Sequence, residues 1–275
     1  MEIRGRKKGT AGCKIQPGRS TSEKSAVTVT RTRMDSLRLS AGWEAEARQW
    51  IQWARAPGHD SYWRFHRDQF FRLLPPPGRQ TLDIGCGEGR LARDLKQLGH
   101  RIVAIDNSSS LVAAARESDP SMDVRLADAA ALPLDDACAD LAVAFMSLQD
   151  IDDMTAAIRE AARVLEPGGR FCLAIVHPMN SAGSFEEATA DARFVIKGDY
   201  LHAFQYADAV ERDGLTMTFN SEHRPLEAYF MALEKAGFLV EALREPGLPE
   251  HAFISEAGRR WQRLPYFLHL RALRR

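Results

Sequence analysis

The chain has 275 residues, of which 45% are hydrophobic and 27% are charged, and its formal net charge is zero. This composition is typical of a soluble globular protein with one α/β domain and additions to it. No apolar run approaches the roughly 18 residues that a membrane-spanning helix needs, and the first residues lack the apolar core of a secretory signal. The cysteines are scattered singly, without a disulfide framework or a metal-ligand spacing. We therefore expect a cytoplasmic protein with reduced thiols, no membrane segment and no metal site.

The charge is unevenly distributed along the chain. Residues 1–33 contain nine basic and two acidic side chains, a net charge of +7, which leaves the rest of the chain at −7. An acidic body is a poor partner for nucleic acid, because that affinity rests mainly on cationic contacts to phosphate. The basic segment has three interpretations: a nucleic-acid arm, a transit-like peptide, or a disordered extension upstream of a true start at Met34. We expect the disordered extension and no nucleic-acid partner.

Two helices are predicted ahead of the first strand. Apolar residues at helical spacing predict one helix over about 40–56 and a second over 62–74, each followed by a proline-containing stop. We interpret residues 34–78 as a helical lid over the domain that follows. The tryptophans of this region are expected to pack in the core. Tyr62 and His66, four residues apart on one helix face, are predicted to point into a pocket.

Short apolar strands and amphipathic helices alternate through the middle of the chain. Continuous apolar runs, typical of buried parallel strands, predict strands at residues 81–84, 101–105, 123–126, 139–145 and 170–176. Helical periodicity between them predicts helices over residues 90–98, 109–117 and 154–165. This alternation predicts an α/β protein with a doubly wound, mostly parallel sheet.

The alternation stops after the fifth strand. Residues 177–224 show no crossover helix, and Asp213-Gly214 between two strand-like runs predicts a hairpin turn. The rest of the chain is predicted to form a helix over 225–236 and strands over 238–243 and 265–273. We therefore predict a main domain of seven strands over residues 79–275. Residues 177–224 are interpreted as an insertion that caps the substrate, beyond the carboxyl ends of the strands.

The segment Thr81–Ala92, TLDIGCGEGRLA, joins the first strand of this domain to its first helix. Glycine at every second position from 85 to 89 lets the backbone turn through positive φ and lets a ligand approach where a Cβ would collide. The helix that follows presents free N–H groups and a positive dipole end to the loop. The dinucleotide fingerprint would have its third glycine where this chain has Arg90. The loop therefore predicts a small polar ligand held against bare backbone.

Carboxylates stand at the ends of three successive strands: Asp83, Asp106 and Asp128. Each alone could cap a helix or favour a turn. Ligands of doubly wound sheets bind outside the carboxyl ends of the strands, so three carboxylates in register predict one site. Asp106 can accept both hydroxyls of a ribose, and Asp128 with the N–H of Ala129 can bind the edge of a purine. Residues 85–89 hold no lysine for a phosphate, so the predicted ligand is an adenosyl group without phosphates.

The segments LDIGCGEGR, AIDNSSS, ADAAALPL, DLAVAFMSLQD and RVLEPGGRF occur in this order over residues 79–176. Their order and spacing resemble the motif series of the class I S-adenosylmethionine (SAM) dependent methyltransferases. The most similar subgroup acts on small molecules and includes ubiquinone/menaquinone-biosynthesis type enzymes. The resemblance implies a Rossmann-like fold, SAM as cofactor, S-adenosylhomocysteine (SAH) as product, and a small-molecule acceptor methylated at O, N or C. The cofactor-binding residues that the motifs imply are Asp83, Gly85, Cys86, Gly87, Gly89, Asp106, Asn107, Asp128, Ala129 and Met146.

Methyl transfer from a sulfonium depends mainly on in-line positioning and on exclusion of water. A general base helps where the acceptor is a hydroxyl or a protonated amine, and histidine is the usual base near neutral pH. His177, directly after the fifth strand, is the first candidate, His223 the second and His66 the third. We interpret the acidic run over 149–153 as a charged helix N-terminus. The predicted substrate-contacting residues are Tyr62, His66, His177, His223 and Arg224.

Two other functions are compatible with the same residues. An RNA methyltransferase would use the basic segment 1–33 to hold its substrate, and the acidic body argues against it. A regulatory module would bind SAM without turnover. The motifs indicate that the ligand binds, but they do not decide whether it reacts. The sequence carries no signal for an oligomeric state. A small-molecule methyltransferase is the function that we expect.

Overall fold

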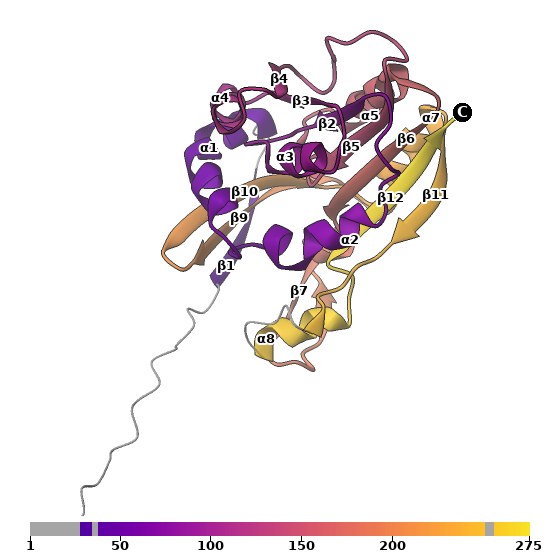
Figure 1. Cartoon of the computed structure of the whole chain (residues 1–275). Coiled ribbons are helices and arrows are strands. Elements are labelled where there is room, and N and C mark those ends of the chain that lie inside the picture. Colours follow the sequence, from indigo (N-terminus) through magenta and orange to yellow (C-terminus); the bar gives the residue numbers. More distant parts are fainter. Residues whose placement is uncertain (1–27, 35–37, 251–255) are drawn as a thin grey trace, which may run out of the picture.

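The computed structural model describes residues 28–34, 38–250 and 256–275 (Figure 1). Its main sheet has seven strands in the order β11-β12-β6-β5-β2-β3-β4. The strands are β2 (Thr81–Ile84), β3 (Ile102–Asp106), β4 (Asp123–Leu126), β5 (Ala139–Phe145), β6 (Leu165–Val176), β11 (Phe238–Arg244) and β12 (Phe267–Arg274). β12 runs antiparallel to β6 and β11, and the other neighbours pair in parallel. The predicted seven-stranded, mostly parallel α/β fold is confirmed.

Helices cover both faces of this sheet, which explains the continuous apolar strands. α5 and α7 pack on one face; η1, α2 and α3 pack on the other, with α4 beside α3. In β5, Ala142 and Ala144 face the first layer, whereas Leu141 and Val143 face the second. The helices are η1 (Tyr62–His66), α2 (Arg67–Phe71), α3 (Arg90–Gln97), α4 (Ser109–Ser118), α5 (Met154–Val164) and α7 (Leu226–Lys235).

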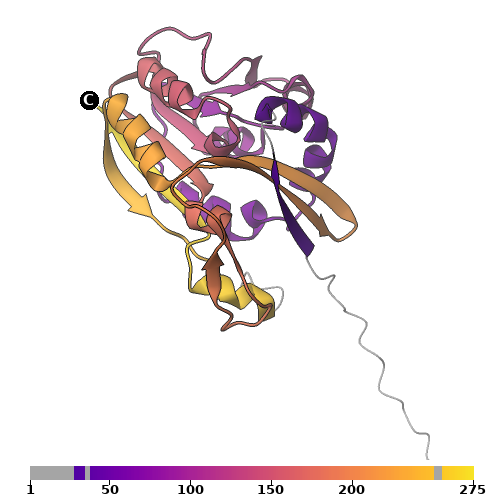
Figure 2. The ribbon, with the colours of Figure 1, turned by 180° about the vertical axis from the view of Figure 1, so that it is seen from behind.

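A second sheet lies across the carboxyl ends of the parallel strands (Figures 1 and 2). It has the order β1-β9-β10, with the bounds β1 (Thr28–Met34), β9 (Phe204–Arg212) and β10 (Leu215–His223). The predicted hairpin is present, because Arg212 pairs with Leu215 around Asp213-Gly214. Helix α1 (Leu39–Arg55) lies against β10, and the indole N–H of Trp43 donates to the Asn220 carbonyl at 2.9 Å. The first lid helix and the insertion thus form one cover, called here the cap.

Strand β1 corrects the prediction that all of residues 1–33 are disordered. Thr28–Met34 pairs antiparallel with β9 along its whole length, from Thr28 opposite Glu211 to Met34 opposite Gln205. Four of its seven residues are β-branched, TVTRTRM, and such residues favour strands. The basic charge of residues 1–33 predicts a disordered extension, whereas the β-branched residues at its end favour a strand. The rest of the predicted extension lies outside the described residues.

The second predicted lid helix is also different in the structure. Residues 62–74 were expected to form one α-helix, but the π-helical turn η1 precedes the short helix α2. At one end of this turn the Tyr62 hydroxyl donates to Asp94 at 2.7 Å, and at the other His66 is hydrogen-bonded to His269 at 2.7 Å. Both inward side chains are therefore fixed across a turn that is wider than an α-helical one.

The remaining elements are short. They are η2 (Leu148–Asp150), α6 (Pro178–Ala182), β7 (Gly183–Phe185), β8 (Phe194–Ile196), α8 (Glu256–Arg259) and η4 (Arg260–Gln262). β7 and β8 form a small antiparallel pair inside the insertion. In the described ranges, no helix has the length and apolar character needed to cross a membrane.

Candidate active site

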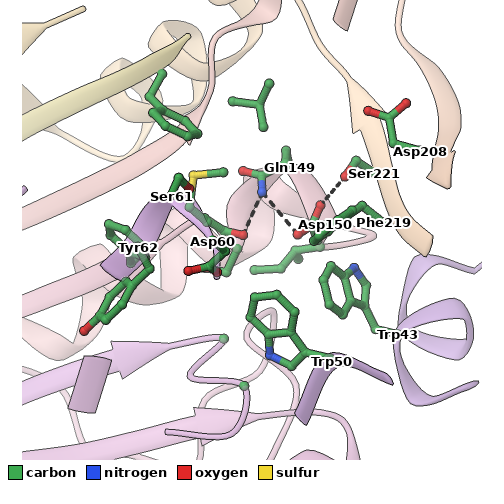
Figure 3. Close-up of a pocket in the computed structure, with 18 of the residues that line it drawn as sticks. Trp43, Trp50, Asp60, Ser61, Tyr62, Gln149, Asp150, Asp208, Phe219 and Ser221 are labelled. Atoms are coloured by element: carbon green, nitrogen blue, oxygen red, sulfur yellow. Dashed lines mark hydrogen bonds between the residues drawn. The ribbon is translucent and has the colours of Figure 1, made fainter. Parts of the chain in front are cut away.

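A cavity of about 1020 Å³ lies between the carboxyl ends of the parallel strands and the cap. Figure 3 shows part of its wall, with side chains from the lid helices, the loop after β5 and strand β10. Nine of the ten predicted cofactor-binding residues line this cavity, on the side that we call the cofactor half. The exception is Gly89, which precedes α3 and faces the core. A Cβ there would approach Ala115 and Met122 at 3.1 Å.

The glycine loop has the backbone that its sequence predicts. Gly85 and Gly87 have φ values of 72° and 58°, in the left-handed region that glycine adopts without strain. A Cβ on Gly85 would lie 2.4 Å from the Cβ of Ser147, and one on Gly87 would lie 3.0 Å from the indole nitrogen of Trp50. The N–H of Gly85 donates to the Ile105 carbonyl at 2.8 Å, which holds the loop against β3. The loop therefore exposes bare backbone to the cavity at a fixed position.

Asp106 joins the end of β3 to this loop. Its Oδ2 accepts from the N–H of Gly87 at 2.8 Å, and its Oδ1 accepts from the N–H of Ser108 at 2.9 Å. Burial raises the pKa of Asp106, although these hydrogen bonds lower it. A carboxylate has about four lone-pair sites, so each oxygen retains acceptor capacity toward the cavity. Asp106 can hold the loop and accept ligand hydroxyls at the same time.

Asp83 and Met146 complete the part of the cofactor half nearest the strand ends. Asp83 is 1% exposed, and its Oδ2 has no hydrogen-bond partner in the described part of the chain. Burial, and then the neighbouring Asp106, raise the pKa of Asp83 to about 7. Met146 follows β5 with φ 59°, an unusual value for a residue other than glycine. Such strain often marks a functional site.

His177 and His223 do not occupy the positions that the sequence predicted. Neither is among the described residues that line the cavity. The Nδ1 of His177 accepts from the N–H of Met179 at 3.1 Å, and its Nε2 lies 3.0 Å from a carboxylate oxygen of Glu245. His177 thus caps α6. Because both of its ring nitrogens are engaged outside the cavity, His177 is not positioned to act as a base.

His223 is also a structural residue. Its Nδ1 lies 2.7 Å from Ser181 Oγ, its Nε2 lies 2.8 Å from the Tyr200 carbonyl, and its ring stacks on Phe204. Arg224 is likewise absent from the described lining. Its guanidinium donates to the carbonyls of Leu148, Ile151 and Asp152, and so fixes the loop after β5.

Tyr62 and His66 do line the cavity, as predicted. His66 is 1% exposed, and its Nε2 is bound to that of His269. Burial, together with His269 and Arg90, lowers the pKa of His66 well below its ordinary value. The hydroxyl of Tyr62 is held by Asp94. These two residues shape the wall, and neither presents a free base to the cavity.

Residues of the loop after β5 that are predicted to form a charged helix N-terminus instead line the cavity in part. In the acidic run, Asp153 caps α5 as expected, accepting from the N–H of Ala156 at 2.9 Å. Asp150 instead faces the cavity, where Ser221 Oγ donates to its Oδ1 at 2.6 Å and Gln149 Nε2 donates to its Oδ2 at 3.1 Å (Figure 3). Burial raises the pKa of Asp150 to about 8 against these hydrogen bonds. The local sequence does not distinguish the buried carboxylate of Asp150 from the capping carboxylate of Asp153.

The prediction that the tryptophans of α1 pack in the core is confirmed for Trp53, which is 3% exposed, and is wrong for Trp43 and Trp50, which are half-buried. Trp43, Trp50 and Trp53 all line the cavity, together with Phe219 from β10. Their helical spacing places them on one face, but that face meets the cavity and the cap hairpin. In the described part of the chain, no three His, Cys, Asp or Glu side chains gather in the way that a metal ion would require.

Comparison with known proteins finds similarity to methyltransferases. Residues 82–173 match the family model described as "Methyltransferase domain". A probable SAM-dependent methyltransferase of Mycolicibacterium smegmatis is 36% identical over 114 residues, which cover 41% of this chain and 44% of that protein. A malonyl-[acyl-carrier protein] O-methyltransferase of Serratia marcescens is 33% identical over 157 residues, covering 55% and 60%. The UbiE C-methyltransferase of Caulobacter vibrioides is 34% identical over 122 residues, covering 39% and 48%. The matched region thus spans about half the length of these relatives.

Solved structures show the same fold over more of the chain. A SAM-dependent methyltransferase from Mesorhizobium loti has a TM-score of 0.62 at 23% identity and covers 78% of this chain and 98% of its own. The fold is that of the class I SAM-dependent methyltransferases. The family match and the names of the relatives support an enzyme of this class and imply SAM as its cofactor.

The residues of the cofactor half fit SAM. Asp83 has a buried acceptor oxygen without a partner among the described residues, and SAM has an ammonium that donates hydrogen bonds. Asp106 retains lone pairs for the two hydroxyls of the ribose. The loop backbone at Gly85 and Gly87 has no room for side chains, and Asp128 with Ala129 lies on the same wall.

Proposed function

We propose that the protein transfers the methyl group of SAM to a small molecule that binds between the cofactor half and the cap. The observation that carries this proposal is a single cavity that reaches from the glycine loop to Trp43, Asp150 and Phe219. Drug-sized ligands occupy pockets of roughly 300–1,000 Å³. A volume of about 1020 Å³ therefore suits a cofactor with a small acceptor beside it.

The cofactor supplies an activated methyl group on a sulfonium. The protein then has to orient the acceptor and to exclude water. Asp106 and the glycine loop fix one side of the reaction space, and the loop from Met146 to Asp150 reaches from the cofactor half to the cap. Helix α1 and the hairpin β9–β10 cover the opening. We assign no histidine as base, because the three candidates are engaged by other groups.

The names of the relatives do not decide which atom accepts the methyl group. Their names include an O-methyltransferase and a C-methyltransferase. They therefore give no reason to prefer a UbiE-like substrate to another small-molecule acceptor. The basic segment does not favour an RNA substrate either. Within its described part, Arg31 is paired with Asp208 and lies over the ring of Tyr206, and Arg33 lies over Phe204.

Incubation of purified protein with methyl-labelled SAM and a fractionated cell extract tests the proposal. We expect label in the metabolite fraction, and less of it at a subsaturating SAM concentration when Asp106→Ala protein replaces the wild type. Label in the RNA or protein fraction would contradict a small-molecule acceptor. Binding of SAH without label in any fraction would favour the regulatory module.

A further inference from the structure

Among the residues that the structure describes, two buried oxygen acceptors without donors line the cavity outside the predicted cofactor residues. Gln149 is 4% exposed and Asp60 is 8% exposed. The Oε1 of Gln149 and the Oδ1 of Asp60 have no hydrogen-bond partner in the described part of the chain, and both residues line the cavity. A buried acceptor without a donor is costly. Two of them around one space indicate a ligand that donates hydrogen bonds.

When ionised, Asp150 adds a negative charge beside Gln149 that has no ion-pair partner among the described residues. Its two hydrogen bonds come from the neutral groups of Ser221 and Gln149 (Figure 3). Arg224 acts on it electrostatically, but that guanidinium is bound to Glu222 at 2.9 Å and to backbone carbonyls. No described cation forms an ion pair with Asp150. A ligand cation could therefore find a counter-charge there.

Two other carboxylates of the cavity wall, Asp208 and Asp60, already have cations. Asp208 accepts two hydrogen bonds from Arg31, at 2.7 and 2.6 Å. The Oδ2 of Asp60 accepts from Arg90 at 2.7 Å. Arg31 and Arg90 are thus occupied, and an anionic ligand would have to compete with Asp208 or Asp60 for them. Arg212 and Arg260, which also line the cavity, donate to the carbonyls of His59 and Glu187, and their Nε atoms have no hydrogen-bond partner in the described part of the chain.

Aromatic rings form the apolar part of the same wall. The ring centroids of Trp43 and Trp50 are 5.7 Å apart. The ring of Phe219 lies 6.3 Å from that of Trp43 and 6.1 Å from that of Trp50, and all three contacts are edge to face. The three rings line the cavity and are only half-buried. Tryptophan faces attract cations and contribute large apolar contact areas. The wall can hold an apolar body next to a positive charge.

We propose that the acceptor molecule carries a basic amino group on an apolar, ring-sized body, with Asp150 and Gln149 receiving the amino group and Trp43, Trp50 and Phe219 holding the body. This inference rests on the proposed function, because it assigns the acceptor of the same cavity. The ammonium has three donors and no acceptor, which matches the carboxylate and the free amide oxygen. A hydroxyl could satisfy one oxygen but would leave the charge of Asp150 uncompensated. The amino group is the element that is recognised, whichever atom takes the methyl.

Phenethylamine is a suitable probe, with 2-phenylethanol and phenylacetate as its neutral and anionic counterparts. Each is titrated by calorimetry into the full chain saturated with SAH at about pH 8.5, where most of Asp150 is ionised. The variant is Asp150→Asn. Asp135→Asn is the matched control, since Asp135 is exposed and is not among the described residues of the cavity wall.

We expect the wild type and Asp135→Asn to bind phenethylamine about tenfold more tightly than 2-phenylethanol, and phenylacetate most weakly. Asp150→Asn should lose about tenfold in affinity for the amine and keep its affinity for the alcohol, because only the amine uses the charge. Equal binding of the three probes, or none by any of them, would overturn the inference. A matching loss of SAH affinity in Asp150→Asn would also overturn it, by assigning the carboxylate to the cofactor. Failure of the wild type to bind SAH would instead refute the proposed function.

Discussion

Asp106 is the residue on which the cofactor half depends most. It accepts from the N–H groups of Gly87 and Ser108 and still has lone pairs for a ribose. Asp106→Ala should therefore weaken SAH binding by about 1.5–3 kcal/mol, the range for hydrogen bonds to a charged group. Asp106→Asn keeps one acceptor oxygen and should lose less. Calorimetry of SAH binding measures both, and unchanged affinity in the alanine variant would refute the assignment.

The raised pKa of Asp150 predicts how the free energy of unfolding depends on pH. Burial raises the pKa of Asp150 from 3.8 to about 8, so the folded protein binds this proton more tightly than the unfolded chain. The contribution of this protonation to the free energy of unfolding is complete below the pKa that Asp150 has in the unfolded chain. It is lost as the pH rises through the pKa that Asp150 has in the folded protein. Asp150→Asn removes this titration. Relative to the wild type, the variant should become more stable between about pH 4 and 8, by at most roughly 1.4 kcal/mol per pH unit.

Urea unfolding of the two proteins at several pH values checks this difference. Asp83, whose pKa is raised to about 7, affects both proteins in the same direction and cancels in the comparison. Parallel stability curves would show that Asp150 titrates normally in the folded protein.

The cofactor half could be predicted from the sequence because its residues follow local rules. A strand end, a glycine loop and a carboxylate are close in the chain, and parallel strands bring Asp83, Asp106 and Asp128 to one edge. The acceptor side depends on distant segments, as the hydrogen bond between Ser221 and Asp150 shows. The histidines were chosen by chemical type, but contacts far along the chain, such as that between His177 and Glu245, decide where their rings point.

At the scale of elements, strand β1 provides the clearest test. It pairs with β9 over its whole length, and its Arg31 binds Asp208 and the Asn180 carbonyl. Deletion of residues 1–33 should lower the melting temperature and impair transfer to the acceptor, because it leaves β9 as an open edge. SAH affinity should change little. Deletion of residues 1–27 keeps β1 and serves as the control; equal behaviour of the two truncations would contradict a role for β1.

The elements of the main sheet could be predicted because buried parallel strands read as continuous apolar runs. The cap was harder to predict. The hairpin was visible from Asp213-Gly214, but β1 is short, polar and completed only by pairing with a strand about 180 residues later. The division of residues 62–74 into η1 and α2 depends on contacts of Tyr62 and His66 to distant side chains, which no local periodicity contains.

For the whole molecule, the proposed methyl transfer requires that one cavity hold cofactor and acceptor together, with the cap on the acceptor side. Val210 on β9 lines this cavity, whereas its neighbour Ala209 is exposed and is absent from the described lining. Successive strand residues point to opposite faces. Tryptophan at these two positions therefore gives a matched pair, Val210→Trp to fill the acceptor side and Ala209→Trp as its control.

The most direct test of the central claim measures label transfer from SAM to the metabolite fraction by these two variants, alongside their affinity for SAH. We predict that Val210→Trp loses at least about tenfold in transfer rate, equivalent to about 1.4 kcal/mol, while both variants bind SAH as the wild type does. Full transfer by Val210→Trp would contradict the account, because the acceptor would then have to bind elsewhere.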